Sequence, residues 1–382
     1  MSWEKIKLAE CCISISDGDH QPPPKAYSGV PFVTIANINK SNQFDFSDTM
    51  FVPREYYDHL DSKRKAQVGD ILYSVVGSFG IPVLIKDEKP FVFQRHIAIL
   101  RPNEKINSAF LYYTMLSRDF FAKADAAAIG AAQRTVSLTS LRNMEIMLPP
   151  LDVQETIASR LSAYDNLIEN NQKQIKLLEE AAQRLYKEWF VDLRFPGYEN
   201  TPIVDGVPEG WKEGTLGQIS LFTRGRTITK AQVHDGNVPV VAGGLEPAYY
   251  HNISNTVAPV ITVSGSGANA GFTRLYNIDI FASDCSYVDS KSTSFLFFVY
   301  CFLKANKMKL DSLQKGSAQP HVYAKDLNAL ELTVPPKKLL EFFCGIVSPY
   351  FEKIRLLQRE IELATQARDR LLPKLMSGEI EV

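Results

Sequence analysis

The chain has 382 residues, of which 45% are hydrophobic and 22% charged, and this length is sufficient for two or three globular domains. The formal net charge of −1 excludes a broadly basic surface, so any grip on nucleic acid must use local clusters of cations or be shared with a basic partner. The five cysteines have no CxxC or zinc-ligand spacing, and no stretch has the pattern of a signal peptide or membrane span, so we expect free thiols in a cytoplasmic protein.

Residues 1–150 are predicted to form a mixed α/β domain. Short apolar runs separated by Gly, Pro and Asp predict strands at residues 30–35, 70–76, 82–85 and 91–100, followed by a helix at 108–128. The polar segment 17–25 contains three consecutive prolines, which favour a rigid loop that presents its side chains outward. A plain surface connection explains this loop equally well.

Residues 157–189 carry seam residues at alternating steps of four and three, which is the a/d pattern of a coiled coil. The seam positions are Ile157, Leu161, Tyr164, Ile168, Asn171, Ile175, Leu178, Ala182, Leu185 and Trp189. A second seam lies 186 residues later, at Phe343, Val347, Tyr350, Ile354, Leu357, Ile361, Ala364, Arg368, Leu371 and Leu375. One long helix cannot bury its apolar stripe alone, so we expect two antiparallel helices related by a pseudo-two-fold axis, with Tyr164 facing Arg368 and Ala182 facing Tyr350.

Four features mark the boundaries and irregularities of these helices. Pro149 and Pro150 precede the first helix, where Asp152 and Glu155 are predicted to form a capping box, and a Phe-Pro-Gly sequence at 195–197 ends it. Asn171 is a polar residue at a seam position, which either fixes the register or lies at a wet end of the interface. Pro349 is predicted to kink the second helix or to start a new one with Ser348 as its cap.

Residues 196–336 repeat the first domain. Trp211 corresponds to Trp3, and the sequences at 237–239, 264–271, 318–320 and 334–336 correspond to those at 29–31, 77–80, 132–134 and 148–150. The predicted fold class is therefore α/β (α+β), with two tandem pseudo-symmetric domains and two long helices that form an antiparallel coiled coil. The expected segments are a first domain (1–150), a first helix (151–195), a linker and second domain (196–336), and a second helix (337–382).

Motifs of catalysis are missing from the chain. There is no phosphate-binding GxxxxGK[ST] loop, no Asn-Pro-Pro-aromatic motif, no HxH or HExxH metal motif and no GxSxG nucleophile elbow. A binding function is therefore the remaining possibility. The loops of each half contain side chains suited to contact base edges or phosphates. These candidate DNA-binding residues are His20, Gln21, Lys25, Arg64, Ser78, Arg95, Gln133 and Arg134 in the first half, and Arg224, Arg226, Lys230, Ser266, Asn269, Gln319 and His321 in the second.

The chain resembles the specificity subunits of type I restriction–modification systems. The most specific stretch is LYKEWFVDLRFPG at 185–197, leading to VPEGW at 207–211. The DGDH sequence at 17–20, Pro149-Pro150-Leu151 with Gln154, and the ending LLPKLMSGEI at 371–380 also match the family. Departures from the family pattern are Asp19, where the family often has Thr, and Pro349 in the second helix.

The resemblance implies two target-recognition domains that each read half of a bipartite site in double-stranded DNA, with the helices as a spacer between them. It also implies that two methyltransferase subunits dock on this scaffold and methylate adenine with S-adenosylmethionine, while this chain itself holds no cofactor, no metal and no catalytic residue. Whether a restriction subunit joins is left open. The alternatives are a stand-alone methyltransferase or nuclease, which would need a cofactor-binding loop, and an adaptor that holds two protein-binding modules apart without touching DNA.

Overall fold

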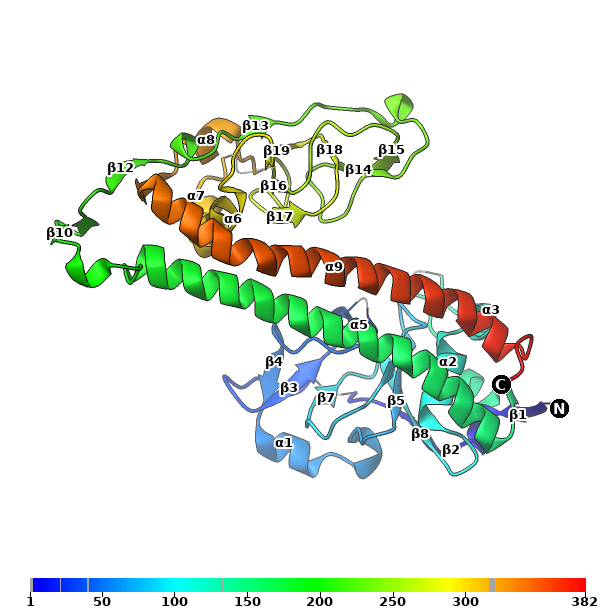
Figure 1. The fold of residues 1–382 in the computed structure, drawn as a ribbon. Coiled ribbons are helices and arrows are strands. Elements are labelled where there is room, and N and C mark those ends of the chain that lie inside the picture. Colours follow the sequence, from blue (N-terminus) through cyan, green and yellow to red (C-terminus); the bar gives the residue numbers. More distant parts are fainter. Residues whose placement is uncertain (1–2, 21, 40, 132, 316–319) are drawn as a thin grey trace. The chain divides into compact units, whose positions relative to one another are not determined.

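The computed structural model describes residues 3–20, 22–39, 41–131, 133–315 and 320–382 (Figure 1). The chain divides into unit 1, made of Met1–Glu169 and Ile361–Val382, and unit 2, made of Asn170–Glu360. Two long helices, α5 (Leu151–Tyr186) and α9 (Lys337–Met376), each contribute a part to both units. In the described part of the chain, no helix is long and apolar enough to cross a membrane.

Three sheets form the strand framework of unit 1. Their strand orders are β1-β9, β2-β8-β5-β6 and β4-β3-β7, and only the pair of β3 and β7 is parallel. The strands are β1 (Glu4–Lys7), β2 (Cys12–Asp17), β3 (Val30–Val33), β4 (Met50–Val52), β5 (Ile71–Ser74), β6 (Pro82–Leu84), β7 (Val92–Phe93), β8 (Ile97–Pro102) and β9 (Glu145–Leu148).

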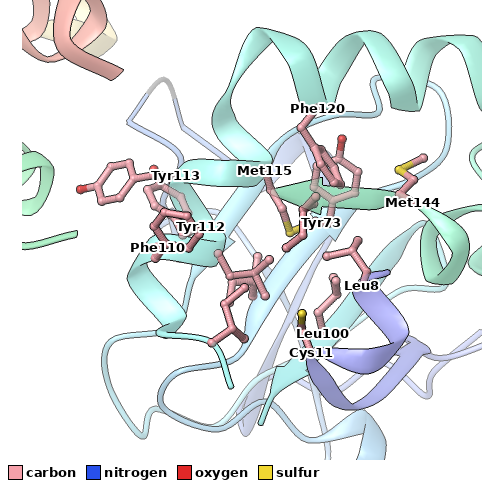
Figure 2. Packing of buried hydrophobic residues seen from close by; sticks show 14 of the residues in the cluster. Leu8, Cys11, Tyr73, Leu100, Phe110, Tyr112, Tyr113, Met115, Phe120 and Met144 are labelled. Atoms are coloured by element: carbon pink, nitrogen blue, oxygen red, sulfur yellow. The ribbon is translucent and has the colours of Figure 1, made fainter. Parts of the chain in front are cut away.

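Four short helices complete the globular part of unit 1: α1 (Arg54–His59), α2 (Ser108–Leu116), α3 (Arg118–Ala127) and α4 (Leu138–Asn143). Figure 2 shows the core, in which Tyr73 of β5 lies among Phe120 of α3 and Met115 of α2. Ile157 of α5 and Leu375 of α9 belong to the same buried cluster. The parts of α5 and α9 that belong to unit 1 are therefore built into its core, rather than projecting from it.

Unit 2 repeats this framework strand for strand. Its sheets have the orders β12-β20, β13-β19-β16-β17 and β15-β14-β18, and again only one pair, β14 with β18, is parallel. The elements are β12 (Lys212–Thr215), β13 (Thr223–Arg224), β14 (Val238–Val241), β15 (Tyr249–His251), β16 (Val260–Ser264), β17 (Thr273–Tyr276), β18 (Phe281–Ala282), β19 (Cys285–Asp289), α6 (Leu296–Ala305), α7 (Lys307–Ser312), α8 (Ala324–Asn328) and β20 (Glu331–Val334). A small hairpin of β10 (Ile203–Val204) and β11 (Val207–Pro208) precedes them.

The predicted secondary structure of the first domain needs two corrections. The strand expected at 91–100 is two strands, β7 and β8, separated by a turn at 94–96. The helix expected at 108–128 is also divided, because Ser117 leaves the helical conformation and its hydroxyl accepts a hydrogen bond from the amide of Phe120, capping α3. Hydrophobic pattern alone does not reveal such breaks, because each of the two parts has buried residues of its own.

The predicted capping box was wrong, and of the two alternatives predicted for Pro349 the start of a new helix was also wrong. Helix α5 begins at Leu151, so Asp152 lies inside its first turn and cannot form the expected capping box with Glu155. Helix α9 continues through Pro349 from Lys337 to Met376, and Ser348 donates to the carbonyl of Cys344 (2.5 Å) instead of capping a new helix. Gly345, whose carbonyl loses its helical partner at Pro349, is exposed, so water can satisfy it.

Within each unit, α5 packs antiparallel against α9. In unit 1, Arg368 Nη1 donates to Asp165 Oδ1 (2.6 Å). Asp165 directly follows Tyr164, the residue that the sequence predicts to face Arg368. In unit 2, Asn171 Nδ2 donates to Glu360 (2.8 Å), and Trp189, in the π-helical turn Lys187–Val191 after α5, stacks edge-on against Phe343 at 5.9 Å. None of the twenty predicted seam residues is exposed. The predicted fold class, with its antiparallel helix pair, is confirmed.

Candidate nucleic-acid interface

In unit 1, the loop after β2 is held against the connection between β7 and β8. Gly18 donates its amide to the carbonyl of Ile97 (3.1 Å), and Asp19 donates to the carbonyl of Phe93 (2.8 Å). A Cβ atom on Gly18 would overlap the carbonyl oxygen of Phe93, so this close approach requires glycine. These contacts fix where residues 17–20 leave the sheet.

Two further loops join this one. The amide of Val75 donates to His96 (2.9 Å), Gly77 donates to the carbonyl of Arg134 (2.9 Å), and Val136 donates to Val75 (2.9 Å). We call the described residues of segments 17–20, 75–80, 93–97 and 129–136 loop cluster 1. Segments far apart in the sequence are thereby brought into one connected surface at the ends of the four-stranded sheet.

Unit 2 contains the same cluster, built by equivalent backbone hydrogen bonds. Gly225 donates to Cys285 (2.8 Å), Gly265 donates to Asp284 (3.2 Å), and Gly267 donates to Pro320 (3.0 Å). We call the described residues of segments 224–226, 265–271, 282–285 and 315–322 loop cluster 2. The hydrogen bonds identify the equivalent positions of the two clusters, which are Gly18 and Gly225, Asp17 and Arg224, Val75 and Gly265, His96 and Asp284, and Thr135 and His321.

Six of the eight candidates from the first half lie in or against loop cluster 1, namely His20, Arg64, Ser78, Arg95, Gln133 and Arg134. His20 hydrogen-bonds to Asp17 (2.8 Å), and Arg64 lies 3.8 Å from Asp19. Arg134 is paired with Asp125 (2.5 Å) and lies 5.4 Å from the ring centroid of Phe79. Ser78 and Gln133 are exposed in the two paired loops.

Arg95, Lys25 and Gln21 differ in their positions. Arg95 is exposed within loop cluster 1, and Lys25 is exposed in the segment that precedes β3; neither forms an ion pair with any described residue. Arg95 also lowers the pKa of its neighbour His96, although burial of that ring lowers it more. Gln21 lies outside the described residues.

Loop cluster 2 contains five of the seven candidates from the second half. Arg224 and Ser266 both hydrogen-bond to the carboxylate of Asp284. His321 pairs with Ser266 through a backbone bridge, and its ring stacks on Tyr323 at 5.9 Å. Asn269 is half-buried in the glycine-rich loop.

The remaining candidates of the second half are less constrained. Arg226 is exposed next to Gly225 and has no ion pair among the described residues, and the same is true of Lys230, which begins a short 3-10 helix outside the cluster. Gln319 lies outside the described residues. Each unit thus combines cations held in place by acids with exposed cations that have no ion pair to any residue the structure describes.

Acidic partners were missing from the sequence-based set. Asp19, Asp125 and Asp284 hold Arg64, Arg134 and Arg224, respectively. Carboxylates do not donate to phosphates or base edges, so residue type alone did not select them. Tyr27 was also missed; it follows the three prolines, and its side chain is fully exposed. Such a ring could stack on a base.

The chemistry of both clusters is that of binding rather than catalysis. Guanidinium, amide, hydroxyl and imidazole groups can contact phosphates and the edges of bases in a DNA groove. In the described part of the chain, no group of three or more His, Cys, Asp and Glu side chains is arranged to hold a metal ion.

Comparison with known proteins agrees with this chemistry. The family model described as "Type I restriction modification DNA specificity domain" matches residues 2–180 and 208–365. The chain is 26% identical to the MjaIX specificity subunit of a type I restriction enzyme from Methanocaldococcus jannaschii, over 82% of this chain and 78% of that protein. It is 21% identical to the HindI specificity subunit from Haemophilus influenzae, over 99% of each.

A solved structure shares the fold. The S subunit of a type I restriction–modification system from M. genitalium covers 98% of this chain and 96% of its own length, with a TM-score of 0.61 at 18% identity. The family model matches the chain twice, once in each of the repeated halves. The chain therefore belongs to the type I restriction–modification DNA specificity domain family.

Proposed function

We propose that this chain is the DNA-specificity subunit of a type I restriction–modification complex. In this proposal residues 1–150 and 196–336 are target-recognition domains, and each reads one half of a bipartite site in double-stranded DNA. The observation that carries the proposal is the duplicated loop scaffold: the backbone contacts of loop clusters 1 and 2 are the same, while their side chains differ. Two readers of different half-sites require this combination of a constant framework and variable surface groups.

The candidate residues divide by their surroundings. Exposed cations without ion pairs among the described residues, such as Lys25, Arg95, Arg226 and Lys230, suit the phosphate backbone, where the position of the charge matters more than the direction of a hydrogen bond. Side chains held by neighbouring groups, such as His20, Arg134 and Arg224, suit base edges, where direction decides the partner. Because the chain has a net charge of −1, it would bind the DNA phosphates together with basic partner subunits.

The long helices would serve as the spacer and as the platform for partners. Helix α5 has 36 residues and α9 has 40, so each is roughly 55–60 Å long. Two methyltransferase subunits would dock on this scaffold and supply S-adenosylmethionine and the transfer of the methyl group to adenine, while this chain supplies recognition alone. A restriction subunit could join the same complex. The five buried, unpaired cysteines fit a cytoplasmic location, where thiols stay reduced.

The test is sequence-specific methylation by the reconstituted complex. The chain is co-expressed with its methyltransferase subunit in a host that lacks adenine methylation, and methylated adenines are mapped by single-molecule sequencing. We expect one bipartite motif, with two short defined halves and a gap of fixed length. If this chain is instead an adaptor between proteins, no sequence-dependent methylation arises, and no sequence-dependent shift of DNA is seen with or without the methyltransferase.

A further inference from the structure

Arg224 differs from the other arginines of the two loop clusters in how tightly its guanidinium is placed. It lies at the end of β13, and its Nη2 donates to Oδ1 of Asp284, whose other oxygen accepts from the hydroxyl of Ser266. Both carboxylate oxygens are therefore engaged, so Asp284 is itself held in place. The Arg224 side chain remains 46% exposed, and it makes no other hydrogen bond with a described residue. One nitrogen of the guanidinium is fixed by Asp284, while nearly half of the side chain's surface is exposed.

Gly265 supplies the space for this arrangement. Its φ angle lies outside the left-handed range, so the backbone does not require glycine there. A Cβ atom on Gly265 would instead overlap Nη1 of Arg224. A side chain at this position would therefore require the guanidinium of Arg224 to move.

Unit 1 provides an internal comparison. At the position equivalent to Arg224 it has Asp17, and at the position equivalent to Gly265 it has Val75, which is buried. The position equivalent to Asp284 is occupied by His96, whose ring hydrogen-bonds to Gln94 (2.7 Å). All three members of the arrangement are therefore replaced together, which indicates that they act as one group.

We propose that Arg224 reads a guanine in the half-site of the second domain, with Asp284 and Gly265 as positioning residues. This inference rests on the proposed function and names the base chemistry of one of its two readers. An arginine fork matches the O6 and N7 acceptors that guanine presents in the major groove, and no other base pair presents that pair of acceptors. The carboxylate that accepts from Nη2 limits the rotation of the fork, so we expect the fork to meet the base edge in one orientation.

The experiment uses the complete complex with its methyltransferase subunits and four variants of this chain. Arg224→Lys keeps the positive charge but removes the fork. Gly265→Ala keeps Arg224 but displaces its guanidinium. Asp284→Asn removes the charge that holds it, and Arg226→Ala removes the neighbouring exposed cation as a comparison. The readouts are the methylated motif from single-molecule sequencing and equilibrium binding to the wild-type site and to sites with one base pair changed.

For the wild-type complex we expect one G·C pair of one half-site to be preferred by roughly tenfold or more over an A·T pair. Arg224→Lys, Gly265→Ala and Asp284→Asn should each reduce this preference at that base pair, leaving the other positions of the motif as they were. Arg226→Ala should weaken binding to all sites alike. Retention of the opposite half-site shows that each variant complex is folded.

Any of three results would overturn the inference. In the first, none of the variants changes the recognition of either half of the motif. In the second, Arg224→Lys keeps the full preference for G·C, and in the third, Asp284→Asn tightens DNA binding while the preference for G·C is unchanged. The last result would make Asp284 a mask that competes with DNA for Arg224. A wild-type complex without any sequence-specific methylation would instead reject the proposed function itself, so the two failures are distinct.

Discussion

The ion pair between Arg368 and Asp165 is predicted to be a principal stabilising contact between the helices of unit 1. Arg368 Nη1 donates to Asp165 Oδ1 (2.6 Å), and the other oxygen of Asp165 accepts from the hydroxyl of Tyr113 (2.6 Å). Burial by itself lowers the pKa of Arg368, but its hydrogen bonds to Asp165 and Asp369 raise the pKa above the ordinary value, so the guanidinium stays charged at any working pH.

The perturbation is Arg368→Met, which leaves Asp165 without its cation. Removing one partner of a buried pair typically costs about 3–5 kcal/mol. The side chains of Arg368 and Asp165 are 19% and 18% exposed, and Tyr113 still donates to the carboxylate, so we expect a smaller loss than this, about 2–3 kcal/mol, in the free energy of unfolding of unit 1. The control is Arg355→Met in the part of α9 that belongs to unit 2, whose pair with Glu352 is 47% and 57% exposed, and which should leave the stability of unit 2 close to that of the wild type.

The assay is urea unfolding with hydrogen-exchange mass spectrometry, because the chain contains two units whose transitions need not coincide. Peptides from α2 and the start of α5 report unit 1, and those from α6 report unit 2. We expect Arg368→Met to lower the stability of unit 1 and Asp165→Asn/Arg368→Met to recover part of the loss, since the double variant leaves no uncompensated charge. An equal, small effect of Arg368→Met and Arg355→Met would refute this reasoning.

Two further predictions concern buried polar groups and thiols. Gln154 is 1% exposed and joins the starts of α2 and α5: it accepts a hydrogen bond from the amide of Asn107 (2.8 Å) and donates to the carbonyls of Lys105 (3.2 Å) and Pro149 (2.8 Å). Gln154→Met leaves these backbone groups without that partner, so it should lower the free energy of unfolding of unit 1 by about 2–4 kcal/mol. Urea unfolding of this variant that matches the wild type would contradict the prediction. Burial raises the pKa of Cys11 and Cys344 to about 11, that of Cys12 and Cys285 to about 12, and also that of Cys301. Because the thiolate is the reactive form, the native chain should react with a thiol reagent only slowly at pH 8. In denaturant all five thiols should react at once. Rapid labelling of any cysteine in the native chain would show that its site opens.

The long helices were predictable because their signal is periodic and long. A seam that alternates steps of four and three over ten positions has few alternative explanations, and its repetition 186 residues later identifies the partner. The continuity of α9 through Pro349 was not predictable from local rules. A proline removes one helical hydrogen bond, but Phe351, Ile354 and Leu357 beyond it are buried, and this burial outweighs the loss.

The loop clusters were predictable in outline only. The repeated anchors placed the glycine-rich loops and the segments around Arg134 and His321 in corresponding positions, and their backbone bridges are indeed equivalent. The ion pairs of Arg134 with Asp125 and of Arg224 with Asp284 could not be predicted from the sequence, because they join segments whose positions relative to each other depend on the completed sheets. Residue type alone therefore suggests which side chains can bind DNA, while the fold decides which of them are held in one direction.

The spacer role of the helices is tested most directly by shortening both by one heptad in register, deleting residues 170–176 and 356–362. The deletion removes about 10 Å of helix, which is the rise of about three base pairs. Single-molecule sequencing of methylated adenines should then show both half-sites unchanged and the unread gap shortened by about three base pairs. A motif with the wild-type gap, methylated as efficiently as before, would contradict the proposal that these helices set the distance between two readers.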